Sequence, residues 1–281
     1  MASIGPTRRA VLGLALATTG CAVKKTSSDL SPLAGLDGRR SRWHGFERFD
    51  FLCERRPATV VVPHRLAQDR PWLWRAEFFG AFANVDQALL ARGWTVTYLD
   101  CRNTFGSPST LARFSAFYDL LTSRHGFSPR PVLLGMSRGG LYAYRWAAAN
   151  PTRVGLIYGD APVCDVKSWP GGKGRGKGSP KDWKLFLETF GLSEADAMDW
   201  RGNPIDLLAP LAQARIPILH VVGTADDVVP VAENTAILAE RYRALGGEIE
   251  IIVKPRGGHH PHGLPDPTSI VDFILEHRLL R

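Results

Sequence analysis

Short apolar runs alternate with longer segments of helical periodicity along most of this chain. Runs of β-branched and other apolar residues predict strands, at residues 43–51, 59–62, 72–79, 95–99, 132–134, 154–158, 216–222 and 249–253. Apolar residues at helical spacing, often followed by Gly or Pro, predict helices, at residues 84–92, 111–124, 139–149, 232–245 and 269–280. This alternation predicts an α/β fold, a mainly parallel, doubly wound sheet with helices on both faces.

One region interrupts the alternation. Between Tyr158 and Ile216 no strand is predicted, so an insertion, at about residues 164–212, follows the sixth predicted strand. The insertion holds a Gly/Lys-rich stretch and three tryptophans: residues 171–178, Trp169, Trp183 and Trp200. Long connections in compact domains are commonly lids or binding loops. We expect Trp169 and Trp183 to contact a substrate, and the alternative is that they pack the insertion onto the body of the domain.

The beginning of the chain has the composition of a targeting segment. Arg8 and Arg9 precede an apolar run, residues 11–17, which is far too short to span a bilayer. A positive segment before a short apolar one predicts an export signal at residues 1–21, and paired arginines indicate the twin-arginine route. The residues around Cys21 resemble a lipoprotein box, so lipidation of Cys21 and membrane attachment are expected. A plain signal with an incidental cysteine is the alternative; either way, an exported, periplasmic or envelope-attached bacterial protein is predicted.

Residues 22–41 are polar and are predicted to tether a single α/β domain, residues 42–281.

Charge is concentrated in one segment. The chain has a formal net charge of +8, and residues 167–184 hold six basic residues and one acid, a net of +5. Charge confined to one loop argues against nucleic-acid binding. It favours an acidic substrate, such as a glycan that contains uronic acid, although a solvated surface loop is the alternative.

A nucleophile motif follows the strand predicted at residues 132–134. The sequence Gly135-Met136-Ser137-Arg138-Gly139 matches the pattern Gly-x-Ser-x-Gly, and a predicted helix begins directly after it. In this context the pattern indicates a sharp turn from strand to helix that holds a serine hydroxyl exposed. Ser137 is therefore the candidate nucleophile.

Two later loops complete the pattern. One strand leads into residues 223–230, Gly-Thr-Ala-Asp-Asp-Val-Val-Pro, and the last strand leads into residues 257–262, Gly-Gly-His-His-Pro-His. We call the turn at residues 135–139 the elbow. Together with the elbow, these loops resemble the α/β-hydrolases over most of residues 43–281. In that fold the nucleophile, the acid and the histidine occur in this order along the chain.

The resemblance implies a catalytic triad. Ser137 needs an adjacent base, and the base needs an acid to orient it. Asp226 occupies the acid position of the pattern Gly-x-x-Asp-x-x-Val-Pro, and His259 follows glycine directly, as the family base does. Asp160, in Gly-Asp-Ala-Pro at the end of an earlier strand, stays open as a rival acid. His260 is the rival base, or else a residue that contacts the substrate.

A narrower resemblance concerns residues 135–146, 159–162 and 259–264. These segments are similar to bacterial exported hydrolases grouped with carbohydrate esterases and prolyl-oligopeptidase-like proteins. The resemblance implies acyl transfer to water through an acyl-enzyme. Because no peptide-filtering domain is visible, we expect an ester of a small molecule or a glycan as substrate. A serine peptidase or an acyltransferase with the same triad is the alternative, and a non-catalytic binding protein is least favoured.

The remaining expectations concern the oxyanion hole and bound groups. One oxyanion donor should be the backbone N–H of Arg138, and Trp74 or Arg75 is expected to supply the other. No metal or organic cofactor is expected, because no Cys or acidic ligand is spaced with the histidines of residues 259–262. Three further cysteines follow Cys21, at Cys53, Cys101 and Cys164. Their number and spacing indicate no disulfide framework, although one pair could be oxidised outside the cytoplasm.

Overall fold

The computed structural model describes residues 1–2, 36 and 38–279. The predicted export signal, Cys21 and most of the predicted tether lie outside the described residues. Every described helix and strand lies within one unit, Pro32–Arg281. Among the described helices, none combines the length and the apolar character needed to cross a membrane.

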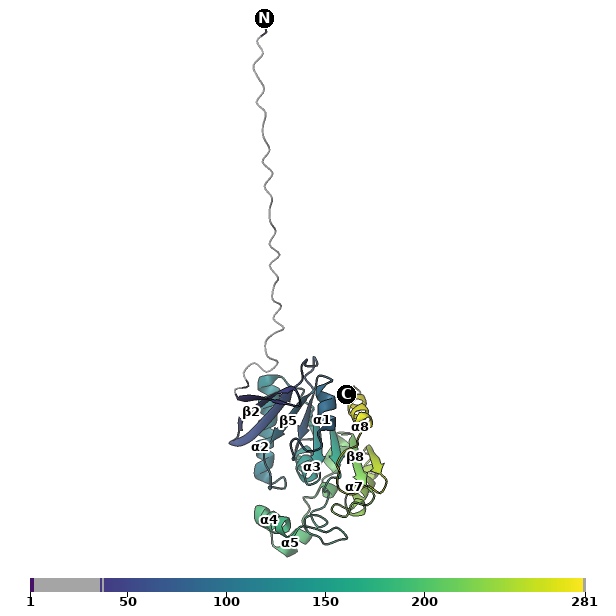
Figure 1. Cartoon of the computed structure of the whole chain (residues 1–281). Helices are drawn as coiled ribbons and strands as arrows, with labels where there is room; N and C mark the ends of the chain where they lie inside the picture. Colours follow the sequence, from purple (N-terminus) through teal and green to yellow (C-terminus); the bar gives the residue numbers. More distant parts are fainter. Residues whose placement is uncertain (3–35, 37, 280–281) are drawn as a thin grey trace. The chain divides into compact units, whose positions relative to one another are not determined.

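A nine-stranded sheet runs through the described part of the chain (Figure 1). Its order is β1-β2-β3-β5-β4-β6-β7-β8-β9, antiparallel from β1 through β3 to β5 and parallel from β5 onward. The strands are β1 (Arg39–Trp43), β2 (Phe46–Cys53), β3 (Arg56–Val62), β4 (Trp72–Arg75), β5 (Thr95–Leu99), β6 (Val132–Met136), β7 (Leu156–Asp160), β8 (Ile218–Gly223) and β9 (Ile249–Lys254). Parallel strands end at the same edge of a sheet, so the loops that follow β4, β6, β7, β8 and β9 meet there.

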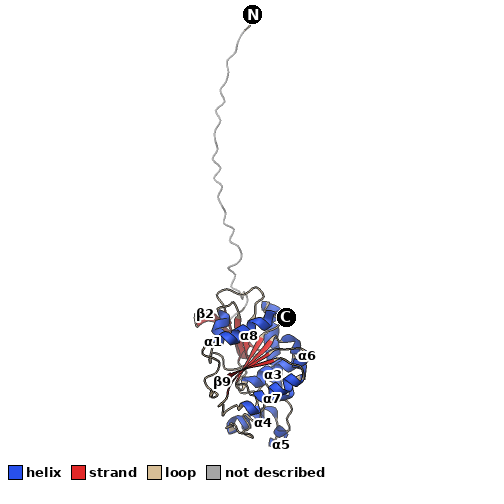
Figure 2. Ribbon diagram, turned by 90° about the vertical axis from the view of Figure 1, so that its right-hand side faces the viewer, coloured by secondary structure: helices blue, strands red, loops and turns tan. Residues whose placement is uncertain are grey.

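Helices cover both faces of the sheet (Figure 2). One face carries α1 (Asn84–Leu90) and α8 (Thr268–Leu279); the other carries α2 (Pro108–Asp119), α3 (Gly139–Ala149), α6 (Ala209–Gln213) and α7 (Thr235–Ala244). Short helical turns cover Leu120–Arg124, a π-helix, and the 3-10 segments Pro151–Arg153, Pro204–Asp206 and Val231–Glu233. The insertion adds α4 (Pro180–Phe190) and α5 (Glu194–Met198), which lie at the lower end of the domain in Figure 1.

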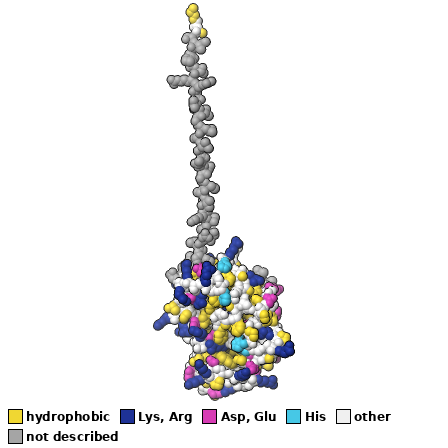
Figure 3. Space-filling model, viewed as in Figure 1, with side chains coloured by type: hydrophobic (Ala, Val, Ile, Leu, Met, Phe, Trp, Pro, Cys, Tyr) yellow, Lys and Arg dark blue, Asp and Glu magenta, His cyan; other side chains and the backbone are white. Residues whose placement is uncertain are grey.

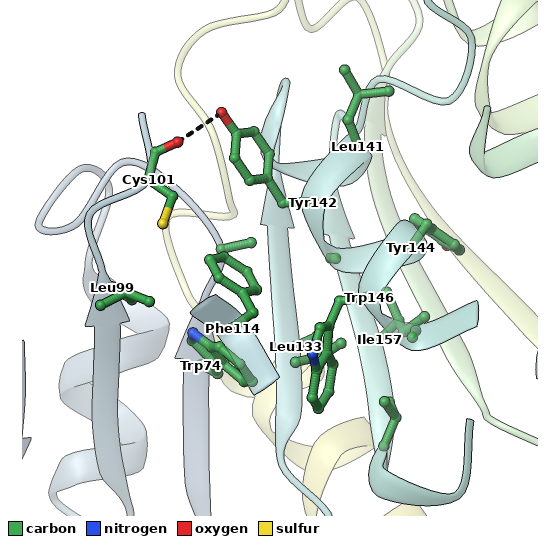
Figure 4. Packing of buried hydrophobic residues seen from close by; sticks show 14 of the residues in the cluster. Trp74, Leu99, Cys101, Phe114, Leu133, Leu141, Tyr142, Tyr144, Trp146 and Ile157 are labelled. Atoms are coloured by element: carbon green, nitrogen blue, oxygen red, sulfur yellow. Dashed lines mark hydrogen bonds between the residues drawn. The ribbon is translucent and has the colours of Figure 1, made fainter. Parts of the chain in front are cut away.

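The two faces bury separate clusters because side chains alternate along each strand. In β6, Leu133 packs with α2 and α3, whereas Val132 and Leu134 pack with α1 and α8. On the α2/α3 side, Trp74 of β4 lies against Phe114, as Figure 4 shows. This apolar packing fixes the strands in place, and with them the ends from which the following loops begin.

The α/β fold is confirmed, and its elements differ from the prediction in detail. The predicted first strand is two strands, because the chain turns at His44 and Gly45, both with positive φ. The insertion therefore follows β7, the seventh strand and not the sixth. The strand predicted at residues 72–79 ends at Arg75, where the chain leaves the sheet for a loop. The cysteines Cys53, Cys101 and Cys164 are buried and free, so no disulfide joins any of the described residues.

Candidate active site

The predicted elbow forms the turn between β6 and α3. Ser137 has φ +49°, a strained value for a residue other than glycine, and such strain concentrates at functional sites. Its backbone is fixed on both sides: the Ser137 N–H donates to the Asp160 carbonyl at 2.9 Å, and the Ser137 carbonyl accepts from the Val163 N–H at 2.9 Å. A Cβ on Gly140 would come within 2.7 Å of the Val163 carbonyl oxygen. The turn is tight because the loop after β7 packs directly against it.

Three side chains from three loops form a continuous hydrogen-bonded relay. The Oγ atom of Ser137 lies 2.9 Å from Nε2 of His259, and Nδ1 of His259 lies 2.7 Å from Oδ2 of Asp226. The Asp226 Oδ1 atom accepts hydrogen bonds from the backbone N–H groups of Val228 and Val229, at 3.0 and 2.8 Å. These bonds fix the carboxylate, and the carboxylate in turn fixes the imidazole with Nδ1 protonated. Such an arrangement can remove a proton from a serine hydroxyl and return it to a leaving group.

The rival acid lies at the end of β7, and the rival base lies next to His259 in the loop after β9. Asp160 is buried and pairs with His262, whose Nδ1 lies 3.1 Å from its Oδ1 atom, and it also accepts a hydrogen bond from Tyr158. His260 is exposed and stacks on Phe82, with ring centroids 5.9 Å apart. The structure therefore brings Asp226 and His259 to Ser137, and it gives Asp160 a different histidine.

The oxyanion-hole prediction for Trp74 is wrong. Trp74 lies within β4 between β5 and β6, and its fully buried indole packs against Phe114 and Trp146 (Figure 4). Arg75 is also unavailable, because its buried guanidinium pairs with Asp86, with Nε 2.6 Å from Oδ1, and donates to carbonyls of the following loop. Both residues lie within β4 and pair with β5 and β6, so the backbone of neither belongs to the loop that faces the elbow.

The loop directly after β4 occupies the place expected for the second donor. A Cβ on Gly139 would lie 3.7 Å from the backbone nitrogen of Glu77, so this loop runs against the start of α3. The Arg138 guanidinium donates to Glu77 Oε1 at 2.8 Å and lies over the Phe78 ring, 5.2 Å from its centroid. Burial raises the pKa of the Glu77 carboxyl, and the charge of Arg138 opposes this shift. These contacts join the elbow to the loop after β4.

Arg138 also contacts the insertion. Its Nη1 atom lies 3.6 Å from Oδ1 of Asp182, in the first turn of α4. Neither Glu77 nor Asp182 was singled out from the sequence. The only available signal for Glu77 was an acidic residue in an otherwise apolar segment at a strand end, and nothing local pairs it with Arg138, 61 residues later. The elbow, the loop after β4 and the insertion are thus linked by one arginine.

The tryptophans of the insertion mainly pack it together. Trp183 has 8% of its surface exposed and stacks on Phe186, with ring centroids 5.6 Å apart. Trp169 is half-buried, and its ring lies 6.5 Å from that of Phe105. The prediction that Trp183 offers a stacking face to a substrate is therefore wrong, because its ring is buried and packs against other side chains of the insertion. Trp169 keeps some exposure and stays a candidate contact residue.

The positive charge of residues 167–184 is largely compensated by acids outside that stretch. Four of its six basic side chains form ion pairs: Lys167 with Asp165, Lys173 with Glu194, Lys177 with Asp227 and Lys184 with Glu188. In the space-filling view, Lys and Arg side chains are scattered over the visible face and form no single patch (Figure 3). The charge count from sequence alone therefore overstated the local positive potential.

A serine held on a strained strand-to-helix turn, with a histidine and an aspartate from later strand ends, defines the class of α/β-fold serine hydrolases. The comparison with known proteins agrees. Residues 43–272 match the Alpha/beta hydrolase family, and the chain belongs to this family. A search of curated proteins returned no match.

Several solved structures share the fold. Dipeptidyl peptidase 4 of Porphyromonas gingivalis superposes with a TM-score of 0.65 and 16% identity, over 84% of this chain and 36% of that one. A bifunctional GH43-CE protein of Bacteroides eggerthii has a TM-score of 0.66 and 18% identity, over 82% of this chain and 38% of that one. The S-formylglutathione hydrolase of Agrobacterium tumefaciens has a TM-score of 0.57 and 16% identity, over 86% of this chain and 96% of that one. The chain thus spans little more than a third of the first two proteins.

Proposed function

We propose that this hydrolase is a serine esterase that cleaves a carboxylic ester through a covalent acyl-enzyme. The observation that carries the proposal is the relay from Ser137 through His259 to Asp226, at 2.9 and 2.7 Å. A serine hydroxyl is a weak nucleophile by itself and becomes effective when a base can take its proton. The relay supplies that base in an orientation that needs no rearrangement.

The proposed reaction has two halves. His259 Nε2 removes the Ser137 proton as Oγ attacks the ester carbonyl, and Asp226 stabilises the resulting imidazolium. The Arg138 backbone N–H and an N–H of the loop after β4 stabilise the oxyanion, in place of the Trp74 donor. His259 then protonates the leaving alcohol. In the second half it activates water, which attacks the acyl-enzyme and releases Ser137.

The extent of the match to two structural neighbours bears on the choice between an ester and a peptide. The dipeptidyl peptidase is matched over 36% of its chain, so most of that protein has no counterpart here, whereas the S-formylglutathione hydrolase is matched over 96%. The near-complete match to the S-formylglutathione hydrolase favours a small ester. The balanced charges of the insertion give an acidic glycan no particular support, and a neutral glycan ester or a small-molecule ester fits equally well.

The test is hydrolysis of p-nitrophenyl esters of increasing acyl length, beside the p-nitroanilide of the same acyl group. We expect ester turnover that is lost in Ser137→Ala, and fluorophosphonate labelling that is lost with it. Faster cleavage of the anilide than of the ester would make the protein a peptidase. Transfer of the acyl group to an added alcohol in preference to water would make it an acyltransferase. Undiminished turnover in Ser137→Ala would overturn the proposed nucleophile.

The proposed location is the cell envelope. It rests on Arg8 and Arg9 before a short apolar run and on the context of Cys21. We expect the full chain to be exported when expressed in a bacterium, and its membrane-bound fraction to become soluble in Cys21→Ala. Replacement of both arginines by lysine should retain the precursor inside the cell. Unchanged membrane association of Cys21→Ala would exclude lipidation as the anchor.

A further inference from the structure

Three histidine rings converge beside Ser137. One ring nitrogen from each of His259, His260 and His262 lies within 4.8 Å of the other two. Their ring centroids are 4.7–4.9 Å apart and the rings meet edge to face. His259 and His262 are buried, and His260 is exposed to solvent. The proposed reaction uses one of these rings and leaves the other two without an assigned task.

Two of the rings are oriented by buried carboxylates. His259 Nδ1 lies 2.7 Å from Asp226, and His262 Nδ1 lies 3.1 Å from Asp160. Each carboxylate accepts a hydrogen bond from Nδ1, so Nε2 of each ring carries the lone pair. In His259 this lone pair faces Ser137 Oγ, and a metal ion that binds it takes the place of the hydroxyl. A carboxylate behind a histidine is the usual outer partner of a metal-bound imidazole, because it fixes the tautomer and strengthens the ligand.

We propose that His259, His260 and His262 form a site for a divalent transition metal ion, with Zn²⁺ the preferred occupant. Three neutral imidazoles with an open fourth position suit Zn²⁺, whose nitrogen ligands lie at about 2.0–2.1 Å in a tetrahedral arrangement. The three nitrogens must draw somewhat closer than 4.8 Å to reach that geometry. The exposed ring of His260 can rotate toward the two buried rings, whose orientations are set by Asp226 and Asp160.

The local charge suits a cation. Asp226 and Asp160 both lie directly behind the site and are buried, with 7% and 1% of their surfaces exposed. Two carboxylates placed behind neutral rings balance a divalent ion in surroundings of low dielectric constant. The sequence predicted no metal because no Cys or acidic ligand is spaced with these histidines. Folding supplies the acids instead from β7 and the loop after β8, as outer partners and not as ligands.

Metal binding and catalysis exclude one another at this site. The His259 Nε2 lone pair accepts the Ser137 hydroxyl proton across 2.9 Å. The same lone pair cannot bind a metal and remove that proton, so an occupied site has no base and Ser137 stays a weak nucleophile. The metal is therefore a reversible inhibitor, and the site makes the hydrolase responsive to free zinc. Inhibition rests on the proposed function, whereas metal binding does not.

The first experiment measures binding alone. The metal-free full chain is titrated with Zn²⁺ by calorimetry, and with Co²⁺ by its visible absorption. We expect one ion per chain, a tetrahedral Co²⁺ spectrum, and an affinity at least about tenfold lower in His260→Gln. His64→Asn, which alters an exposed histidine on another loop, is the matched control and should bind as the unaltered chain does. An equal affinity in His260→Gln, or no binding, would overturn the site.

The second experiment measures the consequence. Fluorophosphonate labelling of Ser137 is followed against Zn²⁺ concentration and again after addition of a chelator. We expect labelling to fall over the range in which Zn²⁺ binds, and to return fully with the chelator. Labelling that continues at saturating Zn²⁺ would overturn the inhibitory role. Labelling of Ser137 in metal-free protein separately tests the proposed function, so the two failures can be told apart.

Discussion

The Oδ1 atom of Asp160 lies 3.1 Å from Nδ1 of His262. The histidine that contacts Ser137 is a different one, His259. Asp160 stands at the end of β7, a position from which the sequence left it open as the catalytic acid. Its hydrogen bonds are taken by His262 and Tyr158. Asp226 instead pairs with His259 at 2.7 Å, so the two carboxylates orient two different imidazoles.

Because Asp226 and Asp160 orient different histidines, we expect their replacement by asparagine to lower kcat by unequal amounts. Asp226→Asn keeps the shape but removes the charge that orients His259 and stabilises its imidazolium, and kcat should fall by about 10⁴-fold. Asp160→Asn should lower kcat by no more than roughly tenfold, because it acts on a ring that takes no proton from Ser137. The measurement is kcat and KM of both variants on one p-nitrophenyl ester. The reverse ranking would assign the catalytic acid to Asp160.

The elbow predicts a contrast between two adjacent glycines. A Cβ on Gly140 would lie 2.7 Å from the Val163 carbonyl oxygen, which is backbone and cannot swing aside, whereas a Cβ on Gly139 would meet nothing closer than 3.5 Å. Both positions lie at the start of α3, where alanine is favoured over glycine by up to about 1 kcal/mol. Gly139→Ala should therefore fold with near-normal stability, and Gly140→Ala should be clearly destabilised. Urea unfolding of the two variants gives the comparison, and equal midpoints would mean that the elbow has more room than the structure shows.

The triad residues could be predicted from the sequence because each belongs to a short pattern whose place in the fold follows from strand order. Ser137, Asp226 and His259 each lie in the loop that follows a strand, and parallel strands bring such loops to one edge. Trp74 was misplaced because an apolar strand and its terminal loop look alike in sequence, and the strand ends only one residue later, at Arg75.

The contacts of Arg138 could not be predicted, for a different reason. They join Glu77, in the loop after β4, with Asp182, in the insertion. Each partner is an ordinary surface-type residue in its own segment, and only the packed fold makes them neighbours. The same applies to the ion pairs of Lys173 with Glu194 and of Lys177 with Asp227, whereas the pairs of Lys167 and Lys184 are local. Local patterns therefore predict the chemistry of the site, whereas its supporting contacts depend on tertiary packing.

The insertion predicts a structural role for Trp183. This indole is buried and stacks on Phe186, so Trp183→Ala leaves a cavity and should cost about 3 kcal/mol. The loss should fall on the insertion itself, as faster amide exchange over α4. A sugar-stacking role would instead lower kcat/KM for glycan esters far more than for p-nitrophenyl acetate. We expect the two substrates to be affected equally, and Trp169→Ala, at a more exposed ring, to be the milder change in stability.

A buried histidine on β8 predicts how stability depends on pH. His220 lies beneath α3, with Nε2 2.7 Å from the Tyr144 hydroxyl and Nδ1 3.0 Å from the Thr235 hydroxyl. Complete burial lowers the pKa of His220 from its usual 6.5 to about 3. Below pH 6.5 the unfolded chain therefore binds a proton that the folded chain does not, and stability is lost as the pH falls.

The loss is about 1.4 kcal/mol per pH unit below 6.5, or about 3 kcal/mol by pH 4.5. His220→Gln retains a hydrogen-bonding side chain without the titration. It should be less stable at pH 7.5, yet lose less stability on acidification by about that amount. Urea unfolding from pH 7.5 to 4.5 measures both slopes, and His64→Asn is the control that should keep the original slope. If His220→Gln and the unaltered chain lose stability in parallel, the ring is protonated in the folded protein, and the α3–β8 contact must then be open enough to admit the charge.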